Sequence, residues 1–289
     1  MFAAADAAAA LPRVARDAHK YSRGVTGFST GTSRFPGAAV LGVSAALCTG
    51  TGMVRYRGPS DVARLVLSRR PEPVCERRTQ APGRVQAWVV GSGMPEDAAT
   101  RAELRFLESR APEAVFVMDA GALAFVEPAD FGDRPRTLLT PHAGELQRML
   151  GRWGEVAERA EIEASPETWA RRAADLSGHT VLLKGPVTAI ASPGADPLLV
   201  EAGHPWLATA GTGDVLAGVI GALAAGSRAP LDRVAAAGAW IHGQAGALAA
   251  ESGPFGASEL PAAVRTVVAR LLAEHGPEDE TAGAQEKRA

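Results

Sequence analysis

The chain has 289 residues, of which 46% are hydrophobic and 21% are charged, and its 32 acidic and 30 basic side chains leave a net charge of −2. This balance is typical of a folded globular protein and excludes wholesale disorder. Because there is no excess of basic residues, neither a nucleic acid nor an anionic membrane surface is expected as a partner.

Two further features concern the location of the protein. The longest apolar stretch, 215–225, is interrupted by glycines and is shorter than the roughly 20 residues that span a bilayer. The two cysteines, Cys48 and Cys75, are far apart and belong to no CxxC or His/Cys cluster, so neither a structural zinc site nor a disulfide framework is expected. A reducing, cytoplasmic location is therefore predicted.

The elements alternate along the chain between two polar or alanine-rich ends. Residues 1–19 have no basic residue ahead of their apolar run, unlike a signal peptide, and are predicted to be a flexible leader, and 276–289 a disordered tail. The strands are predicted at 24–31, 85–90, 114–118, 137–139, 180–183, 187–191 and 198–200, and the helices at 97–109, up to residue 150, 212–225, 231–249 and 258–273.

This order predicts one α/β domain over residues 20–275. Strands that are apolar on both faces and separated by helices are typical of a parallel sheet covered on both sides. We therefore expect a three-layer α/β/α sandwich with a mostly parallel central sheet, and a hairpin at Pro193-Gly194.

Small or polar clusters follow four consecutive strands of this predicted sheet. In open α/β sheets, ligands bind outside the carboxyl ends of the strands, so these clusters together predict a ligand crevice, although glycine and proline also end strands for steric reasons. The clusters are Gly91–Gly93, Asp119–Gly121, Thr140–His142 and Lys184–Gly185.

The most informative segment is Ala210-Gly-Thr-Gly-Asp214, which leads directly into an apolar helix. The first amides of a helix have no intrahelical partner and lie at the positive end of its dipole, so this segment predicts a phosphate site. A simpler interpretation makes Thr212 the N-cap and Asp214 a charge that complements the dipole, but it leaves Gly211 and Gly213 unexplained.

Phosphoryl transfer to a hydroxyl is the chemistry that fits this segment. The backbone amides can stabilise the charge on the transferred group while the carboxylate of Asp214 accepts the hydroxyl proton. In the field of the helix N-terminus, this carboxylate is expected to stay ionised at neutral pH. No GxxxxGK[ST] loop occurs in the chain.

The segment 210–214 resembles the anion-hole and catalytic-base motif of the ribokinase-like superfamily, and within it the chain resembles the ADP-dependent NAD(P)H-hydrate dehydratases over about residues 20–273. The Thr140–Glu145 segment, similar to the TPHxGE signature of these enzymes, is the discriminating one. The other similar stretches are 33–41, 89–93 and the KGxxT-like 184–188.

The resemblance implies that the hydrated, 6-hydroxylated form of NADH or NADPH is phosphorylated from ADP and then loses phosphate, which restores the cofactor and leaves AMP. It assigns the catalytic role to Asp214 with Gly211, Thr212 and Gly213. The substrate would contact Ala38, Ala39, Gly93, His142 and Asp214, and the nucleotide Lys184, Gly185, Pro186, Val187, Thr188 and Gly213.

Each of these residues also has a purely structural interpretation. Lys184 could be a solvated turn residue, Gly93 a strand end and 35–39 a tightly packed helix entrance. His142 could cap a helix, with Glu145 as its capping-box acid. His242 lies on an apolar helix and is expected to be a core or interface residue.

Cofactors and partners follow from the resemblance alone. It implies Mg²⁺ without naming its ligands; Asp119 could hold the ion through water or cap the next turn, and Gly121 replaces a second acidic residue found in the commoner family pattern. ADP and ATP both stay open as co-substrates. A functional link to an NAD(P)H-hydrate epimerase is implied, since many relatives are fused to one and this chain holds no such segment, and the Ala/Gly-rich helices are compatible with a homo-oligomer.

Two competing functions remain. One is a small-molecule kinase of the same superfamily, such as a hydroxymethylpyrimidine or hydroxyethylthiazole kinase, against which the Thr140–Glu145 segment argues. The other is a non-enzymatic nucleotide sensor, against which Asp214 and its two neighbouring glycines argue.

Overall fold

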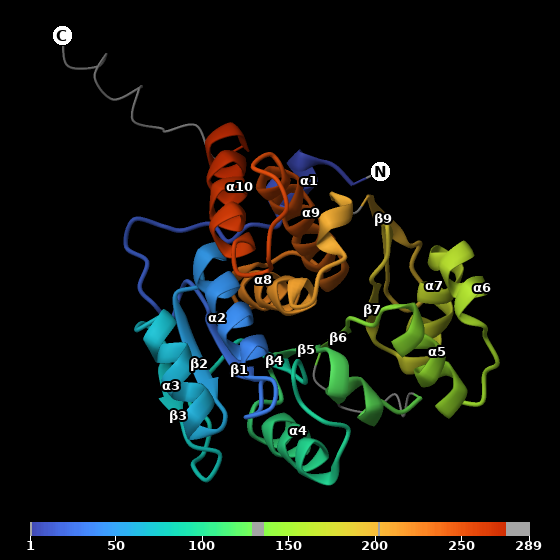
Figure 1. Ribbon diagram of the computed structural model, residues 1–289, viewed down its shortest axis with the longest axis horizontal. Coiled ribbons are helices and arrows are strands. Elements are labelled where there is room, and N and C mark those ends of the chain that lie inside the picture. The colour runs from blue at the N-terminus through green and yellow to red at the C-terminus, as the bar shows by residue number, and fades with distance from the viewer. Residues whose placement is uncertain (1, 129–135, 202, 276–289) are drawn as a thin grey trace.

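The computed structural model describes residues 2–128, 136–201 and 203–275, which form a three-layer α/β/α sandwich (Figure 1). The central sheet has nine strands in the order β3-β2-β1-β4-β5-β6-β7-β8-β9. All neighbouring pairs from β3 to β7 are parallel, whereas β8 runs antiparallel to both β7 and β9. The predicted fold class is confirmed. The strands are β1 (Val25–Ser29), β2 (Met53–Arg57), β3 (Val74–Glu76), β4 (Ala87–Val90), β5 (Val115–Met118), β6 (Thr137–Leu139), β7 (Thr180–Leu183), β8 (Val187–Ala191) and β9 (Leu198–Glu201).

Helices cover both faces of the sheet, because its central strands are apolar on both sides. One face is covered by α1 (Ala4–Ala9), α2 (Gly37–Thr49), α3 (Ser60–Arg69), α8 (Thr212–Gly226), α9 (Leu231–Ala250) and α10 (Leu260–His275). The other is covered by α4 (Ala98–Arg110), α5 (Ala143–Arg152) and α7 (Pro166–Ser177), with α6 (Arg159–Ala164) beside α5 and α7. Two short 3₁₀ helices, η1 (Ala120–Phe125) and η2 (Pro205–Leu207), lie in the connections.

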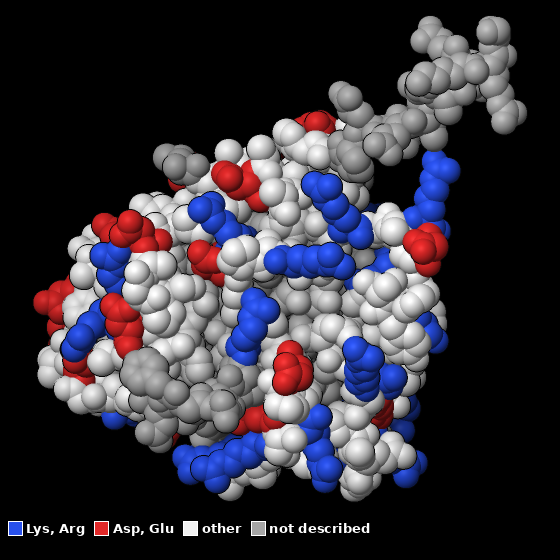
Figure 2. All heavy atoms as spheres, turned by 180° about the vertical axis from the view of Figure 1, so that it is seen from behind, with Lys and Arg blue, Asp and Glu red and all other residues white. Residues whose placement is uncertain are grey.

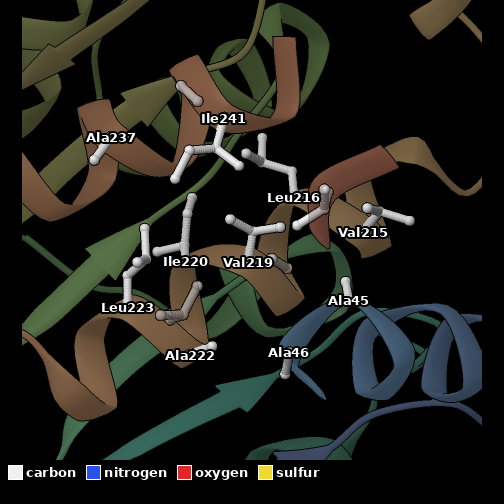
Figure 3. Close-up of a cluster of buried hydrophobic side chains, with 14 of the residues drawn as sticks. Ala45, Ala46, Val215, Leu216, Val219, Ile220, Ala222, Leu223, Ala237 and Ile241 are labelled. Atoms are coloured by element: carbon white, nitrogen blue, oxygen red, sulfur yellow. The ribbon is translucent and has the colours of Figure 1, made fainter. Parts of the chain in front are cut away.

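Helix α8 is the centre of the larger core. Figure 3 shows Ile220 of α8 and Ile241 of α9 directed toward each other, with Ala45 and Ala46 of α2 on the other side of α8. Helices α2 and α8 approach closely, because a Cβ built on Gly218 would lie only 2.2 Å from the carbonyl oxygen of Gly42. The packing of these two helices fixes the N-terminal end of α8 over the sheet.

Several parts of the chain differ from the sequence-based expectation. Residues 159–177, for which no element was expected, form α6 and α7. Residues 2–11, assigned to a flexible leader, contain α1 and bury Phe2, Ala7 and Leu11 in the core shared with α9 and α10, because an alanine face fits closely against those helices. The segment 53–76, for which no element was expected, forms β2, α3 and β3. The predicted tail at 276–289 lies outside the described residues.

The surface carries both signs of charge. On the face drawn in Figure 2, basic and acidic side chains are interspersed, in keeping with the net charge of −2. None of the helices within the described ranges combines the length and the apolar character that crossing a membrane requires.

Candidate active site

The entrance of α8 is built by the glycine turn at 210–214. Gly211 is the N-cap in the left-handed conformation (φ +93°), and a Cβ there would lie 2.7 Å from Leu41 Cδ1, so only glycine fits. The first intrahelical bond runs from the Val215 amide to the Gly211 carbonyl at 3.2 Å. The amides of Gly213 and Asp214 precede that bond and therefore have no intrahelical acceptor, as an anion site requires.

The side chain of Thr212 stabilises this turn by bonding to the preceding 207–209 loop, and it does not cap the helix. Its hydroxyl donates to the carbonyl oxygens of Leu207 at 2.8 Å and Thr209 at 3.0 Å, and the N-cap is Gly211. The interpretation of Thr212 as an N-cap is wrong, because its side chain points back into the 207–209 loop.

Asp119, at the end of β5, is a hydrogen-bonding centre under the site. Its carboxylate accepts from Ser92 Oγ at 2.9 Å, Thr140 Oγ1 at 2.9 Å and Lys184 Nζ at 2.8 Å, and the residue is 4% exposed. Burial alone raises the pKa of Asp119, but the Lys184 ammonium and the two hydroxyls hold that pKa below its ordinary value. Asp119 makes no side-chain cap on η1, so the capping interpretation is wrong.

Lys184 connects the ends of three elements. Besides Asp119, its Nζ lies 3.6 Å from Glu145 Oε2 at the start of α5, and 3.8 Å from the position of a Cβ built on Gly213. Burial lowers the pKa of Lys184, but Asp119 and Glu145 outweigh it and hold the pKa above its ordinary value. A largely buried ammonium, with 21% of its side chain exposed, thus faces the α8 entrance, and Lys184 is not a solvated turn residue.

His142 and Glu145 form a capping box at the start of α5. The Nδ1 of His142 accepts from the amides of Gly144 at 3.1 Å and Glu145 at 3.2 Å, and Glu145 Oε2 accepts from the His142 amide at 2.8 Å. Since Nδ1 is an acceptor, the proton of the neutral ring is on Nε2. Burial, with the nearby cations, lowers the pKa of His142 despite Glu145, so the ring presents a neutral donor at a half-exposed position.

Backbone pairing brings the histidine segment next to the lysine turn. His142 and Lys184 form an isolated parallel bridge, in which the Lys184 amide donates to the Pro141 carbonyl at 2.8 Å. In the 184–188 segment, Thr188 is buried, whereas Gly185, Pro186 and Val187 form an exposed rim. The structure thus separates one inward-facing lysine from three residues at the surface.

Ala38 and Gly93 meet beside β1. A Cβ on Gly93 (φ +68°) would lie 2.8 Å from Ala38 Cβ and 2.9 Å from the Phe35 carbonyl oxygen, while Thr32 Oγ1 donates to the Gly93 carbonyl at 3.0 Å. Ala39, in the same first turn of α2, packs against Gly31. Small residues are required here because two loops and a helix end approach within van der Waals contact.

The protonation of Asp214 differs from the expectation. Burial, reinforced by the charge of Asp119 and opposed by Lys184, raises the pKa of Asp214 to about 7. This pKa differs from the expectation of a fully ionised carboxylate at neutral pH, because burial and the charge of Asp119 outweigh the charge of Lys184. A carboxyl with this pKa is well suited to exchange a proton near neutral pH.

The acidic residues leave no preformed metal cage. Within the described ranges, no group of three or more His, Cys, Asp or Glu side chains is close enough to hold a metal ion. The oxygens of Asp119 already accept three hydrogen bonds, which leaves Asp214 as the carboxylate without such partners among the described residues. Mg²⁺ commonly needs only one or two carboxylates in addition to water and phosphate oxygens, so the site is compatible with an ion that arrives with a nucleotide.

Two neighbours of the site, Ser92 and His242, were not given a role in it by the sequence. Ser92 belongs to the glycine turn after β4 and, as described, bonds to Asp119. His242 of α9 has its Nε2 buried with no hydrogen-bond partner among the described residues, and burial lowers its pKa to about 4, while the backbone of Thr212 acts in the opposite direction. The burial of His242 agrees with the expectation of a core residue, whereas its place beside the α8 entrance depends on tertiary packing.

Comparisons with known proteins agree on one family. The sequence model of the NAD(P)H-hydrate dehydratase family matches residues 28–266. The chain is 42% identical over 274 residues to the bifunctional NAD(P)H-hydrate repair enzyme Nnr of Mycobacterium leprae, covering 93% of this chain and 56% of that protein. It is 34% identical over 254 residues to the ADP-dependent (S)-NAD(P)H-hydrate dehydratase of Neisseria meningitidis, covering 85% of this chain and 84% of that one.

A solved structure gives the same result. The ADP/ATP-dependent NAD(P)H-hydrate dehydratase of Bacillus subtilis, co-crystallised with ATP and Mg²⁺, superimposes with a TM-score of 0.82 at 26% identity, covering 93% of this chain and 97% of that one. The chain spans about half the length of the bifunctional relatives that it matches.

Proposed function

The chain belongs to the NAD(P)H-hydrate dehydratase family, and on that premise we propose that it dehydrates the 6-hydroxylated form of NADH or NADPH at the expense of ADP, giving NAD(P)H, AMP and phosphate. The observation that carries the proposal is the α8 entrance, where the amides of Gly213 and Asp214 lack intrahelical acceptors and the pKa of Asp214 is about 7. A proton acceptor and an anion site therefore adjoin each other.

The first step transfers a phosphoryl group. Asp214 takes the proton of the substrate hydroxyl, whose oxygen bonds to the terminal phosphorus of ADP while the bond to the AMP oxygen breaks. The amides at the α8 entrance and the Lys184 ammonium stabilise the negative charge on the phosphoryl oxygens. Ala38 and Gly93 border the nicotinamide ring, with the Nε2 proton of His142 available as a donor to it.

The second step removes phosphate. Hydroxide is a poor leaving group, whereas phosphate departs readily with the electrons of the carbon–oxygen bond as the ring nitrogen donates its lone pair. Loss of a proton from the neighbouring ring carbon then completes the dihydropyridine.

The nucleotide and its metal ion are assigned to the same edge of the sheet. The 184–188 turn and Gly213 border the nucleotide, and Mg²⁺ would neutralise its phosphates. The Bacillus subtilis relative, co-crystallised with ATP and Mg²⁺, supports this assignment and keeps ATP open as a second phosphoryl donor. Asp214 is the carboxylate available to that ion or its water shell.

The dehydratase is favoured over a vitamin-precursor kinase of the same fold. The family match and the Neisseria meningitidis relative support it, as does the His142–Glu145 capping box that connects the histidine segment to Lys184. A cytoplasmic location, a homo-oligomeric state and a functional link to an epimerase are part of the same proposal; the free thiols of Cys48 and Cys75 are compatible with that location.

The decisive experiment incubates the protein with hydrated NADH or NADPH and ADP or ATP, and follows nicotinamide absorbance and phosphate release together. We expect equal amounts of reduced cofactor and phosphate, with AMP formed from ADP. Reactions without nucleotide and without hydrate are the controls. A stable phosphorylated substrate without return of absorbance would indicate a kinase, and no nucleotide-dependent product would contradict an enzymatic role.

A further inference from the structure

Arg57 is a fully buried cation (0% exposed) at the end of β2, outside the site described above. Its Nε donates to Glu103 Oε1 of α4 at 2.7 Å, and Ser29 Oγ donates to the same oxygen at 3.2 Å. The charge of Arg57 is therefore neutralised on one side by a buried carboxylate, which explains how it is tolerated in the core.

The rest of the Arg57 guanidinium holds the backbone that follows β3. Its Nη1 donates to the carbonyl oxygens of Arg77 at 2.9 Å and Gln80 at 2.7 Å, and Nη2 donates to that of Arg78. A segment without regular structure is thus fixed at the edge of the sheet where β1, β2 and β4 end. The consequence is a defined position for the side chain of Arg78.

Arg78 reaches the glycine turn of the candidate site. Its Nη2 lies 3.9 Å from the sulfur of Met94, the residue directly after Gly93. Its Nε is buried without a hydrogen-bond partner among the described residues, and the nearest carboxylate oxygen within those ranges, Glu103 Oε1, lies 4.0 Å away and already accepts from Arg57. The carboxylate of Asp97 caps α4 by accepting a hydrogen bond from the Thr100 amide. That bond is the main cause of the lowered pKa of Asp97, and the charge of Arg78 adds only a small part.

Arg78 is therefore a positioned guanidinium with unused donors. A guanidinium has five N–H groups, and a thioether sulfur is a weak acceptor for any of them. Its fork matches two oxygens of a phosphate, and it stays charged at any pH at which proteins fold.

We propose that Arg78 binds the diphosphate bridge of the hydrated dinucleotide. The inference rests on the proposed function, in which the nicotinamide ring lies against Ala38 and Gly93. One ribose separates that ring from the diphosphate, which places the two phosphates close to the Gly93–Met94 turn. Arg78 thus selects a dinucleotide over a nicotinamide riboside, and Arg57 is the positioning residue beneath it.

The test compares Arg78→Gln with Arg77→Gln, since Arg77 is an exposed neighbour in the same segment. For Arg78→Gln we expect KM for hydrated NADH and hydrated NADPH to rise about tenfold or more, with kcat and KM for ADP within about twofold of wild type, as loss of a charged hydrogen bond implies. Arg78→Lys should recover part of the loss. With hydrated reduced nicotinamide riboside, which has no diphosphate, Arg78→Gln and wild type should be equally active.

Other outcomes overturn the proposal. Equal KM values for the Arg78 and Arg77 variants would do so, as would a loss limited to the NADPH hydrate, which would point to the 2′-phosphate. Calorimetric binding of NADPH to the same variants does not depend on turnover, so weaker binding in Arg78→Gln than in Arg77→Gln supports the assignment even if the wild type fails to dehydrate the hydrate.

Discussion

Asp214 combines two opposing requirements in one carboxyl group. It must be buried to lie beside the α8 amides, and burial raises its pKa to about 7. Lys184 opposes this shift, while Asp119, held ionised by Lys184 and two hydroxyls, reinforces it. The carboxyl group is therefore less stable as an anion than an exposed one, and that is what makes it a stronger base.

Burying the ionised carboxylate of Asp214 lowers the stability of the fold, so we expect Asp214→Asn to be more stable than wild type. The folded pKa of about 7 lies above the usual value for Asp, so the folded state binds more protons between about pH 4 and pH 7, and wild-type stability falls as pH rises through that window. The penalty is complete above about pH 7 and is on the order of 4 kcal/mol, from a rise of about three pKa units. We expect the asparagine variant to have a higher Tm than wild type, by more at pH 8 than at pH 5, and no turnover. Undiminished turnover would refute the role of Asp214, and a Tm gain that does not change with pH would refute the raised pKa.

Gly211 and Gly213 should respond differently to alanine, although they are only two positions apart. Gly211→Ala places a Cβ at φ +93° and 2.7 Å from Leu41, so it should lower the Tm. At Gly213, the nearest described atom to a Cβ would be Lys184 Nζ at 3.8 Å, and helix propensity favours alanine by about 1 kcal/mol. Gly213→Ala should therefore keep or raise the Tm but weaken ADP binding about tenfold or more, because the methyl group occupies space in front of the amides. Thermal unfolding and calorimetric titration with ADP measure both effects, and wild-type ADP affinity in Gly213→Ala would contradict the anion site.

At the scale of elements, the glycines of α8 serve packing within the chain. Gly218 permits the contact with Gly42 of α2, and a Cβ on Gly221 would lie 2.4 Å from Val89 Cγ2 of β4. These approaches explain the glycine-dotted apolar helix without a subunit contact. They also connect the site to the core, since the same helix begins at Gly211.

Gly218→Ala should consequently destabilise the fold. The new Cβ would meet backbone atoms of Gly42 at 2.2 Å and 2.9 Å, so two helices would have to separate, at a cost of about 1–3 kcal/mol or more. Gly151→Ala in α5 is the matched control, because its Cβ would meet no atom within 4 Å and the substitution should stabilise by up to about 1 kcal/mol. Denaturant unfolding of both variants gives the comparison. Equal stability of the two variants would show that α2 and α8 are not as closely packed as described.

The elements differ in how far their sequences predicted them. Strands β4 to β9 and helices α8 to α10 were predicted because their apolar runs are continuous and end at glycine, proline or polar clusters. Strand β2 was missed because its two arginines interrupt the apolar pattern expected of a buried strand. Arg57 can be buried because Glu103, far away in the sequence, neutralises its charge. The motifs did predict which segments meet at the sheet edge. They did not predict the pKa of Asp214 or the buried Nε2 of His242, because both depend on burial by elements that are distant in the sequence.

At the scale of the whole molecule, the candidate site joins distant parts of the chain. Ala38 and Gly93 come from the first half of the chain, and Lys184 and Asp214 come from the second. Among the described residues, the halves are joined here by the parallel pairing of β6 with β7, by the packing of α8 on α2, β1 and β4, and by the Lys184–Asp119 ion pair. A ligand that binds these segments together binds the folded state alone. Its affinity must therefore appear as stability of the entire domain.

ADP should raise the Tm of the wild-type protein, and ligands with fewer phosphate groups should raise it less. At a concentration one hundred times its Kd, it adds about 2.7 kcal/mol, which for a domain of this size corresponds to a shift of about 5–10 °C. Because the α8 amides and Lys184 bind phosphate rather than the base, the shift should decrease from ADP to AMP to adenosine at equal concentration. Thermal unfolding with each ligand, repeated on Gly213→Ala, measures this order, and the variant should lose most of the difference between ADP and adenosine. If adenosine stabilised the protein as much as ADP, the nucleotide would be held by its base, and the α8 entrance would lose its role in phosphoryl transfer.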